Sequence, residues 1–152
     1  MGKRILAVDD SVMMLEVYFH VLVAEGYSVS AATGGGQALR QLEDDMGVPD
    51  LILLDIGLPD MSGWEFLRVI RQRVEWRAIP VLVVSAFVEP SVAEGATYPE
   101  YQRYLSKMET ARELVPLVRE IIGIPAVDEA APPTSAIRDD EADEDEVWPL
   151  AA

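Results

Sequence analysis

Apolar and polar positions along the chain predict strands that alternate with helices. Predicted strands cover residues 4–8, 27–32, 50–55, 79–87 and 101–107. The first predicted helix follows Ser11, which can cap it, and runs to about Glu25. Further helices are predicted within 33–45, over 63–74 and over 109–123, where Pro116 interrupts the last one. Three of the strands are continuous apolar runs, which is typical of strands covered by helices on both faces. The pattern therefore predicts an α/β fold with a doubly wound, five-stranded parallel sheet.

Polar residues stand where the predicted strands end. In doubly wound sheets the functional site lies beyond the carboxyl ends of the strands. Those ends carry Asp9 and Asp10, Asp55, Ser85 and Lys107. Three neighbouring carboxylates need a neutralising cation, and ligands that are all oxygen favour Mg²⁺. A hydroxyl and an ammonium could bind phosphoryl oxygens, and Asp55 is the candidate for attack on phosphorus.

Composition narrows the functional classes. The net charge of −15 repels phosphate backbones, so we expect no binding to nucleic acid. The chain has no cysteine, which excludes a disulfide framework and a cysteine zinc site and is compatible with the cytoplasm. We find no signal peptide, and no apolar stretch approaches the roughly 20 residues of a membrane helix. A cytoplasmic protein without membrane insertion is expected.

The charge is concentrated near the end of the chain. Residues 123–152 hold nine acids and one arginine among many prolines and alanines, whereas residues 1–122 carry the strand and helix pattern. We therefore predict a domain over 1–122 and a disordered acidic tail over 123–152. Trp148 and Leu150 are apolar positions within the acidic run. The tail could fold onto a partner, fold onto its own domain, or only increase solubility.

Four motifs in order, AVDDS, LILLDIGLPDMSGWE, VLVVSA and YLSK, resemble the receiver domain of bacterial two-component response regulators over about residues 3–122. The resemblance implies a flavodoxin-like fold with strand order 2-1-3-4-5. It implies that Mg²⁺ is bound by Asp9, Asp10, Asp55 and the backbone carbonyl of Gly57. It also implies that Asp55 accepts a phosphoryl group from a histidine kinase or a histidine phosphotransfer protein.

Three further roles come from the same resemblance. Ser85 and Lys107 are expected to bind the phosphate, and Tyr104 looks like the aromatic switch residue. Asp60 is expected only to make a turn after Pro59.

The helix after Ser11 is apolar on nearly all sides. A core stripe of Val12, Leu15, Tyr18 or Phe19, and Leu22 is predicted, which leaves four residues toward the outside: Met13, Met14, Val17 and Val21. In receivers this helix docks the phosphodonor, and methionines suit an adaptable contact. The alternatives are that the tail covers this face or that it is a wide core face.

Two positions depart from the receiver pattern. Met108 stands where receivers usually have proline, and a cis bond before a non-proline residue costs about 2.5–4 kcal/mol, so we expect a trans bond. The segment 88–102 contains Pro90, Gly95 and Pro99, which predict a short, irregular helix 4. We therefore expect an output surface unlike that of the usual dimerising transcription factors.

These observations predict a stand-alone receiver that signals to an unidentified downstream protein by protein–protein contact. It is not expected to be an enzyme, apart from self-catalysed phosphorylation and slow dephosphorylation. One alternative is a receiver-fold binding module that needs no phosphate. The other is a Mg²⁺-dependent phosphohydrolase, which would need a second acid near Asp55; glycine at position 57 argues against it.

Overall fold

The computed structural model describes residues 2–44, 47–86 and 103–125 of the 152-residue chain. Its elements, in chain order, are β1 (Arg4–Val8), α1 (Val12–Ala24), β2 (Ser28–Ala32), α2 (Gly35–Glu43), β3 (Leu51–Leu54), α3 (Gly63–Arg71), β4 (Val81–Ser85), β5 (Arg103–Ser106), the short 3₁₀ helix η1 (Lys107–Glu109) and α5 (Thr110–Ile122). The five strands form one parallel sheet in the order β2-β1-β3-β4-β5, which confirms the predicted fold.

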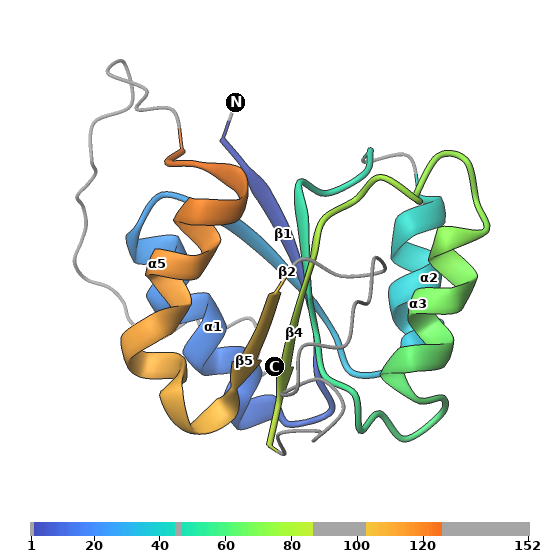
Figure 1. Cartoon of the computed structure of the whole chain (residues 1–152), viewed down its shortest axis with the longest axis horizontal. Helices are drawn as coiled ribbons and strands as arrows, with labels where there is room; N and C mark the ends of the chain where they lie inside the picture. The colour runs from blue at the N-terminus through green and yellow to red at the C-terminus, as the bar shows by residue number, and fades with distance from the viewer. Residues whose placement is uncertain (1, 45–46, 87–102, 126–152) are drawn as a thin grey trace.

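The sheet lies between two helical layers. Helices α1 and α5 cover one face, and α2 and α3 cover the other (Figure 1). Successive strand side chains point to opposite faces, so Ile5 and Ala7 enter the core beneath α1 and α5, while Leu6 and Val8 enter the other core. Burial on both faces explains why the central strands are continuous apolar runs. Within the described ranges, no helix is long and apolar enough to cross a membrane.

The strand register determines where the polar residues emerge. Val8 pairs with Leu54, so Asp9 and Asp55 follow at the same level of neighbouring strands. The backbone N–H of Asp55 donates to the carbonyl of Val8 at 2.9 Å, and that of Asp9 donates to the carbonyl of Ala32 at 3.0 Å. Backbone hydrogen bonding therefore brings the two acids to one edge of the sheet.

Helix α5 corrects one prediction. It runs unbroken from Thr110 to Ile122 with Pro116 inside it, so the expected interruption is wrong. Proline removes one backbone donor, but Pro116 and Arg112, whose carbonyl loses that partner, both lie on the exposed face, where water can replace the bond. The opposite face holds the helix on the sheet through the buried residues Leu114, Leu117 and Val118.

Helix α1 corrects a second prediction, which concerns its buried residues. Its buried stripe is Leu15, Tyr18 and Leu22, whereas Val12 is 49% exposed, so the predicted core position of Val12 is wrong. Val12 continues the stripe one turn earlier, but it is the first residue of the helix, only four residues after β1 ends at Val8. Ser11 caps the helix as predicted, because its hydroxyl accepts from the N–H of Met14 at 3.2 Å.

Two predicted features lie outside the described residues: the irregular helix within 88–102 and the acidic tail beyond Pro125. The first residues assigned to the tail are described. The hydroxyl of Tyr27 donates to the carbonyl of Gly123 at 2.7 Å, and Pro125 is buried close to Gly26. Packed structure therefore continues past residue 122.

Asp60 does more than make a turn. Its carboxylate accepts hydrogen bonds from the N–H groups of Gly35 and Gly36, at 2.9 and 2.8 Å, and so caps the start of α2 from another loop. A Cβ at Gly34 would lie 2.9 Å from an Asp60 oxygen, and one at Gly35 would lie 2.5 Å from Met61. These glycines leave room for the two side chains that the loop after β3 places against the start of α2.

Replacing Asp60 with alanine tests this cap. The N–H groups of Gly36 and Gly35 lower the pKa of Asp60, so its contribution is present above the ordinary carboxyl value of 3.8 and is lost as pH falls through the lowered value. At pH 7 we expect Asp60→Ala to reduce the free energy of unfolding by about 0.5–1 kcal/mol, the lower part of the range for caps, because the carboxylate is exposed to solvent. Urea unfolding at several pH values measures this.

Asp60→Asn is the matched control, since its amide oxygen can accept from one of the two N–H groups, whereas its NH₂ group cannot accept from the other. At pH 7 its stability should fall between those of the wild type and Asp60→Ala. A deficit for Asp60→Ala that is absent at pH 7, or that does not shrink as the pH falls below the ordinary carboxyl value of 3.8 and through the lowered pKa of Asp60, would contradict the cap.

Candidate functional site

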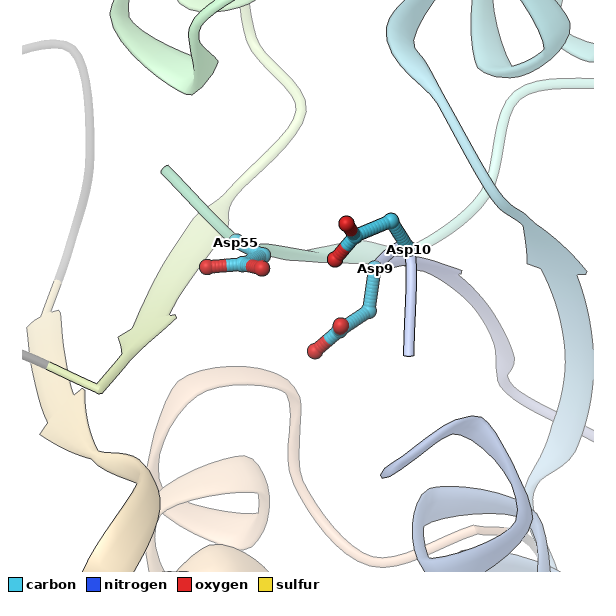
Figure 2. Close-up of side chains that lie close together, drawn as sticks. All are labelled: Asp9, Asp10 and Asp55. Carbon is cyan, nitrogen blue, oxygen red and sulfur yellow. The ribbon is translucent and has the colours of Figure 1, made fainter. Parts of the chain in front are cut away.

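Three carboxylates meet at the carboxyl edge of the sheet. Oxygen atoms of Asp9, Asp10 and Asp55 all lie within 4.8 Å of one another (Figure 2). Asp9 and Asp55 are buried, whereas Asp10 is exposed. The cluster predicted from the strand ends is thus present, with one side open to solvent.

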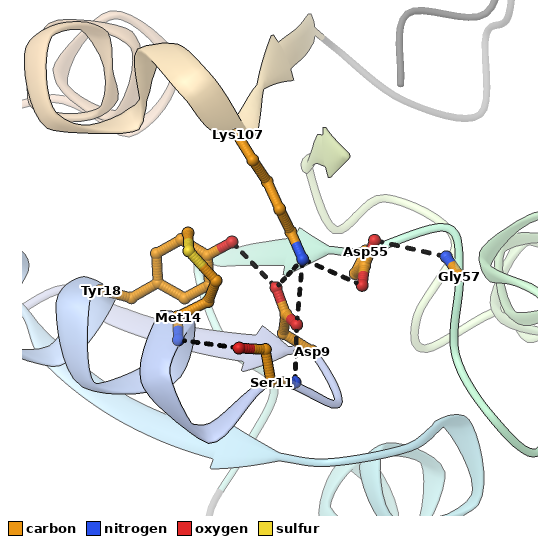
Figure 3. Close-up of polar contacts among 7 residues, drawn as sticks. All are labelled: Asp9, Ser11, Met14, Tyr18, Asp55, Gly57 and Lys107. Atoms are coloured by element: carbon orange, nitrogen blue, oxygen red, sulfur yellow. Dashed lines mark hydrogen bonds and ion pairs between the residues drawn. The ribbon is translucent and has the colours of Figure 1, made fainter. Parts of the chain in front are cut away.

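Lys107 lies among these acids. Its Nζ is 3.0 Å from Asp9 Oδ2 and 3.3 Å from Asp55 Oδ2 (Figure 3). The lysine begins η1, directly after β5, and no peptide bond in the described ranges is cis, so the expected trans bond before Met108 is confirmed. A trans loop therefore still delivers the ammonium to both carboxylates.

The charges act on one another. Burial alone would lower the pKa of Lys107, but hydrogen bonds and attraction from Asp9 and Asp55 raise its pKa overall, so the ammonium form is retained. Burial raises the pKa of Asp9, against the lowering effect of the Ser11 N–H and Lys107. Three carboxylates and one ammonium leave an excess of negative charge at this edge.

Asp9 has a partner that sequence reasoning missed. The Tyr18 hydroxyl donates to Asp9 Oδ2 at 3.1 Å, while the N–H of Ser11 donates to Asp9 Oδ1 at 2.9 Å (Figure 3). Burial, and then the charge of Asp9, raise the pKa of Tyr18, which keeps the hydroxyl protonated as a donor. The available signal was a tyrosine in a core stripe, since buried tyrosine hydroxyls usually find a partner.

The loop after Asp55 is shaped by close backbone contacts. The N–H of Gly57 donates to Asp55 Oδ1 at 3.3 Å, which places Gly57, whose carbonyl was predicted as a metal ligand, beside the acid (Figure 3). Gly63 begins α3, and a Cβ there would lie 2.7 Å from the Asp55 carbonyl oxygen and 2.7 Å from the Ile56 Cα. Gly63 therefore lets α3 start directly against the backbone that carries Asp55.

Ser85 ends β4 and is buried, opposite Ser106 of β5. Because side chains alternate along a strand, Ser85 shares the face of Val81 and Val83, which belongs to the core beneath α2 and α3. Tyr104 packs against that same core. Its hydroxyl is buried and has no hydrogen-bond partner within the part of the chain that the structure describes.

The four predicted docking residues on α1 differ in how much of each side chain is exposed. Met13 is 73% exposed, but Met14, Val17 and Val21 are partly buried, and Met14 and Val21 pack against the core that α1 shares with α5. Of these four residues only Met13 is thus largely exposed, and the docking role of the group stays a prediction. Helices α1 and α5 lie on the same face of the sheet (Figure 1). Met108, which directly follows Lys107 in the chain, is another exposed apolar residue, at 88%.

The donor set fits a magnesium ion. All the candidate side-chain ligands are carboxylate oxygens, which Mg²⁺ prefers, and exposed Asp10 leaves room for the water ligands that this ion retains. The excess of negative charge gives a divalent cation an electrostatic reason to bind.

This sheet order, with an acid cluster and a lysine at the carboxyl edge, is the architecture of a flavodoxin-like receiver domain. The chain belongs to the response regulator receiver domain family, whose sequence model matches residues 5–119. It is therefore a receiver of the two-component type.

Individual relatives agree with this assignment. The polar-differentiation response regulator DivK of Brucella ovis is 28% identical over 123 residues, covering 81% of this chain and 98% of DivK. The chemotaxis protein CheY4 of Vibrio cholerae is 25% identical with a TM-score of 0.71, covering 80% of this chain and 99% of CheY4. TrrA of Thermotoga maritima, solved in complex with Mg²⁺-BeF, is 28% identical with a TM-score of 0.66, covering 78% and 98%.

Two glycines of the Asp55 loop give a matched test of its shape. At Gly63 an added methyl group meets backbone on two sides, so Gly63→Ala should reduce the free energy of unfolding by about 1–3 kcal/mol. At Gly57 the same methyl group meets nothing within 4 Å, so Gly57→Ala should change it by no more than about 0.5 kcal/mol. Chemical denaturation of both variants makes the comparison, and equal stabilities would show that the contact at Gly63 is not constraining.

Proposed function

We propose that this receiver is a phosphorylation-activated switch in a two-component phosphorelay. Asp55 accepts a phosphoryl group from the phosphohistidine of a histidine kinase or a histidine phosphotransfer protein, in a reaction that depends on Mg²⁺. The output is contact with a downstream protein. The observation that carries the proposal is the ammonium of Lys107 between Asp9 and Asp55, at the open edge of a carboxylate cluster.

The transfer balances as a single displacement at phosphorus. One carboxylate oxygen of Asp55 forms the new P–O bond, the P–N bond to the donor imidazole breaks, and the bonding pair remains on the imidazole nitrogen. Asp55 suits this role because its two oxygens are already distinguished: Oδ1 accepts from the N–H of Gly57, and Oδ2 pairs with Lys107.

The remaining groups of the site, the magnesium ligands and Lys107, serve to balance the negative charge of the carboxylates and the phosphoryl group. Asp9, Asp10, Asp55 and the carbonyl of Gly57 would hold Mg²⁺, which when bound supplies positive charge against the carboxylates and the transferred phosphoryl oxygens. Its occurrence with BeF in the related TrrA structure supports this assignment. Lys107 would exchange part of its contact with Asp55 for a phosphoryl oxygen, because the ammonium already lies within 3.3 Å of that carboxylate.

The response begins at the ends of β4 and β5. The Ser85 hydroxyl would donate a hydrogen bond to the phosphoryl group. Tyr104 would then change its position, because it occupies the same face of the sheet one strand away. A local change of charge is thereby converted into a change of packing that a partner can recognise.

Asp55 is a phosphoacceptor and not the nucleophile of a classical enzyme. Receiver domains are signalling proteins, and slow loss of the phosphate by hydrolysis would reset this one. A steady phosphohydrolase would need an acid at the leaving group, whereas position 57 in the Asp55 loop has no side chain.

Intact-mass spectrometry after incubation with Mg²⁺ and acetyl phosphate tests the proposal. We expect the wild type to gain one phosphoryl group, Asp55→Asn to gain none, and EDTA to prevent the gain. Asp60→Asn is the matched control in the same loop: it loses a carboxylate that lies outside the cluster and should still be phosphorylated.

If neither acetyl phosphate nor phosphoramidate modifies the wild type, the phosphorelay proposal fails and the phosphate-independent binding module takes its place. Modification of Asp55→Asn to the same extent as the wild type would instead move the acceptor to another residue.

A further inference from the structure

Tyr18 reaches the acid cluster from within the core of the domain. We propose that Tyr18 is a positioning residue, whose hydroxyl holds the Asp9 carboxylate in the orientation that binds Mg²⁺. This inference rests on the proposed function, because it concerns the same metal site. It assigns to α1 a part in building the site that its apolar sequence does not suggest.

The hydrogen bond between Tyr18 and Asp9 is protected from water. Tyr18 is 1% exposed and Asp9 is fully buried, with 3.1 Å between the hydroxyl and Oδ2 (Figure 3). Water cannot easily replace a donor at such a depth, so removing the hydroxyl would leave a buried carboxylate oxygen with one partner fewer. The contact therefore matters more than a similar contact at the surface.

Three donors determine how the Asp9 carboxylate lies. The N–H of Ser11 holds Oδ1, the Tyr18 hydroxyl holds Oδ2, and Lys107 lies 3.2 Å from Oδ1 and 3.0 Å from Oδ2. In the proposed reaction Lys107 turns part of its contacts to the phosphoryl group. Ser11 and Tyr18 are then the donors that stay with Asp9 throughout, and Tyr18 is the one that acts through a side chain.

Tyr18 is a rigid donor. Its ring belongs to the buried stripe of α1, between Leu15 and Leu22, so packing determines the position of the hydroxyl. The ring alone would satisfy that packing, since phenylalanine has the same shape without the oxygen. The hydroxyl is therefore explained by Asp9 and not by the core. Partners that orient ligands in this way typically change metal affinity by 10–100-fold when they are removed.

The test compares two buried tyrosines in the full chain. Tyr18→Phe removes the hydroxyl that contacts Asp9. Tyr27→Phe removes the hydroxyl of a side chain that is 2% exposed overall; this hydroxyl donates to the Gly123 carbonyl at 2.7 Å in a partly buried hydrogen bond. Tyr27 precedes β2, at the amino edge of the sheet, so its loss should affect stability without touching the acid cluster.

We expect titration calorimetry with MgCl₂ on the unphosphorylated protein to show about tenfold weaker binding for Tyr18→Phe. Tyr27→Phe should stay within about twofold of the wild type. Urea unfolding with saturating Mg²⁺ gives a second readout. An ion that binds the folded state but not the unfolded state raises the free energy of unfolding. At an equal Mg²⁺ concentration, Tyr18→Phe should gain less than Tyr27→Phe.

Wild-type affinity in Tyr18→Phe, or an equal loss in both variants, would overturn the positioning role while leaving the phosphorelay proposal in place. A wild type that binds no Mg²⁺ would overturn both. Weakened binding confined to Tyr18→Phe, with both variants folded, would support the role.

Discussion

The contact of the Lys107 ammonium with the carboxylates of Asp9 and Asp55 is the interaction on which the site depends. Two of the three acids are buried, and like charges at such a depth are costly unless a positive charge compensates them. One lysine compensates only in part. The remaining negative charge gives a divalent cation an electrostatic reason to bind at this edge, and under the proposed function that cation would accompany the phosphoryl group. The described side chains of the site therefore leave some negative charge uncompensated, which suits a switch that responds to a change of charge.

The rest of the domain supports this arrangement from two sides. On one side, Tyr18 connects Asp9 to the core that α1 shares with α5. On the other, Gly63 lets α3 begin against the backbone of Asp55, and Asp60 ties the same loop to the start of α2. A change of charge at Asp55 would therefore be felt by helices on both faces of the sheet.

Sequence patterns were most successful where a local rule decides the outcome. The strand ends identified Asp9, Asp10, Asp55, Ser85 and Lys107, and the structure brings them to one edge because parallel strands share a direction. Local rules failed where contacts with other elements of the fold determine the burial or conformation of a residue. Pro116 remains inside α5 because it lies on the face of the helix that is open to water, while the opposite face packs on the sheet. Met14 is partly buried because it packs against the core that α1 shares with α5. The partners of Tyr18 and Asp60 were missed because they lie nine and about 25 residues away.

The sequence by itself determined the class of fold, the edge of the sheet at which the acid cluster forms and the residue types present there. These features follow from the spacing of apolar residues and from the residues at the strand ends, which are properties of short segments. Tertiary structure decided which acids are buried, which oxygen each donor contacts, and which side of α1 remains exposed. Those properties arise from contacts between segments far apart in the chain, so no local pattern carries them. The open edge, the buried pair of acids and the tyrosine beneath them exist only once the layers have packed.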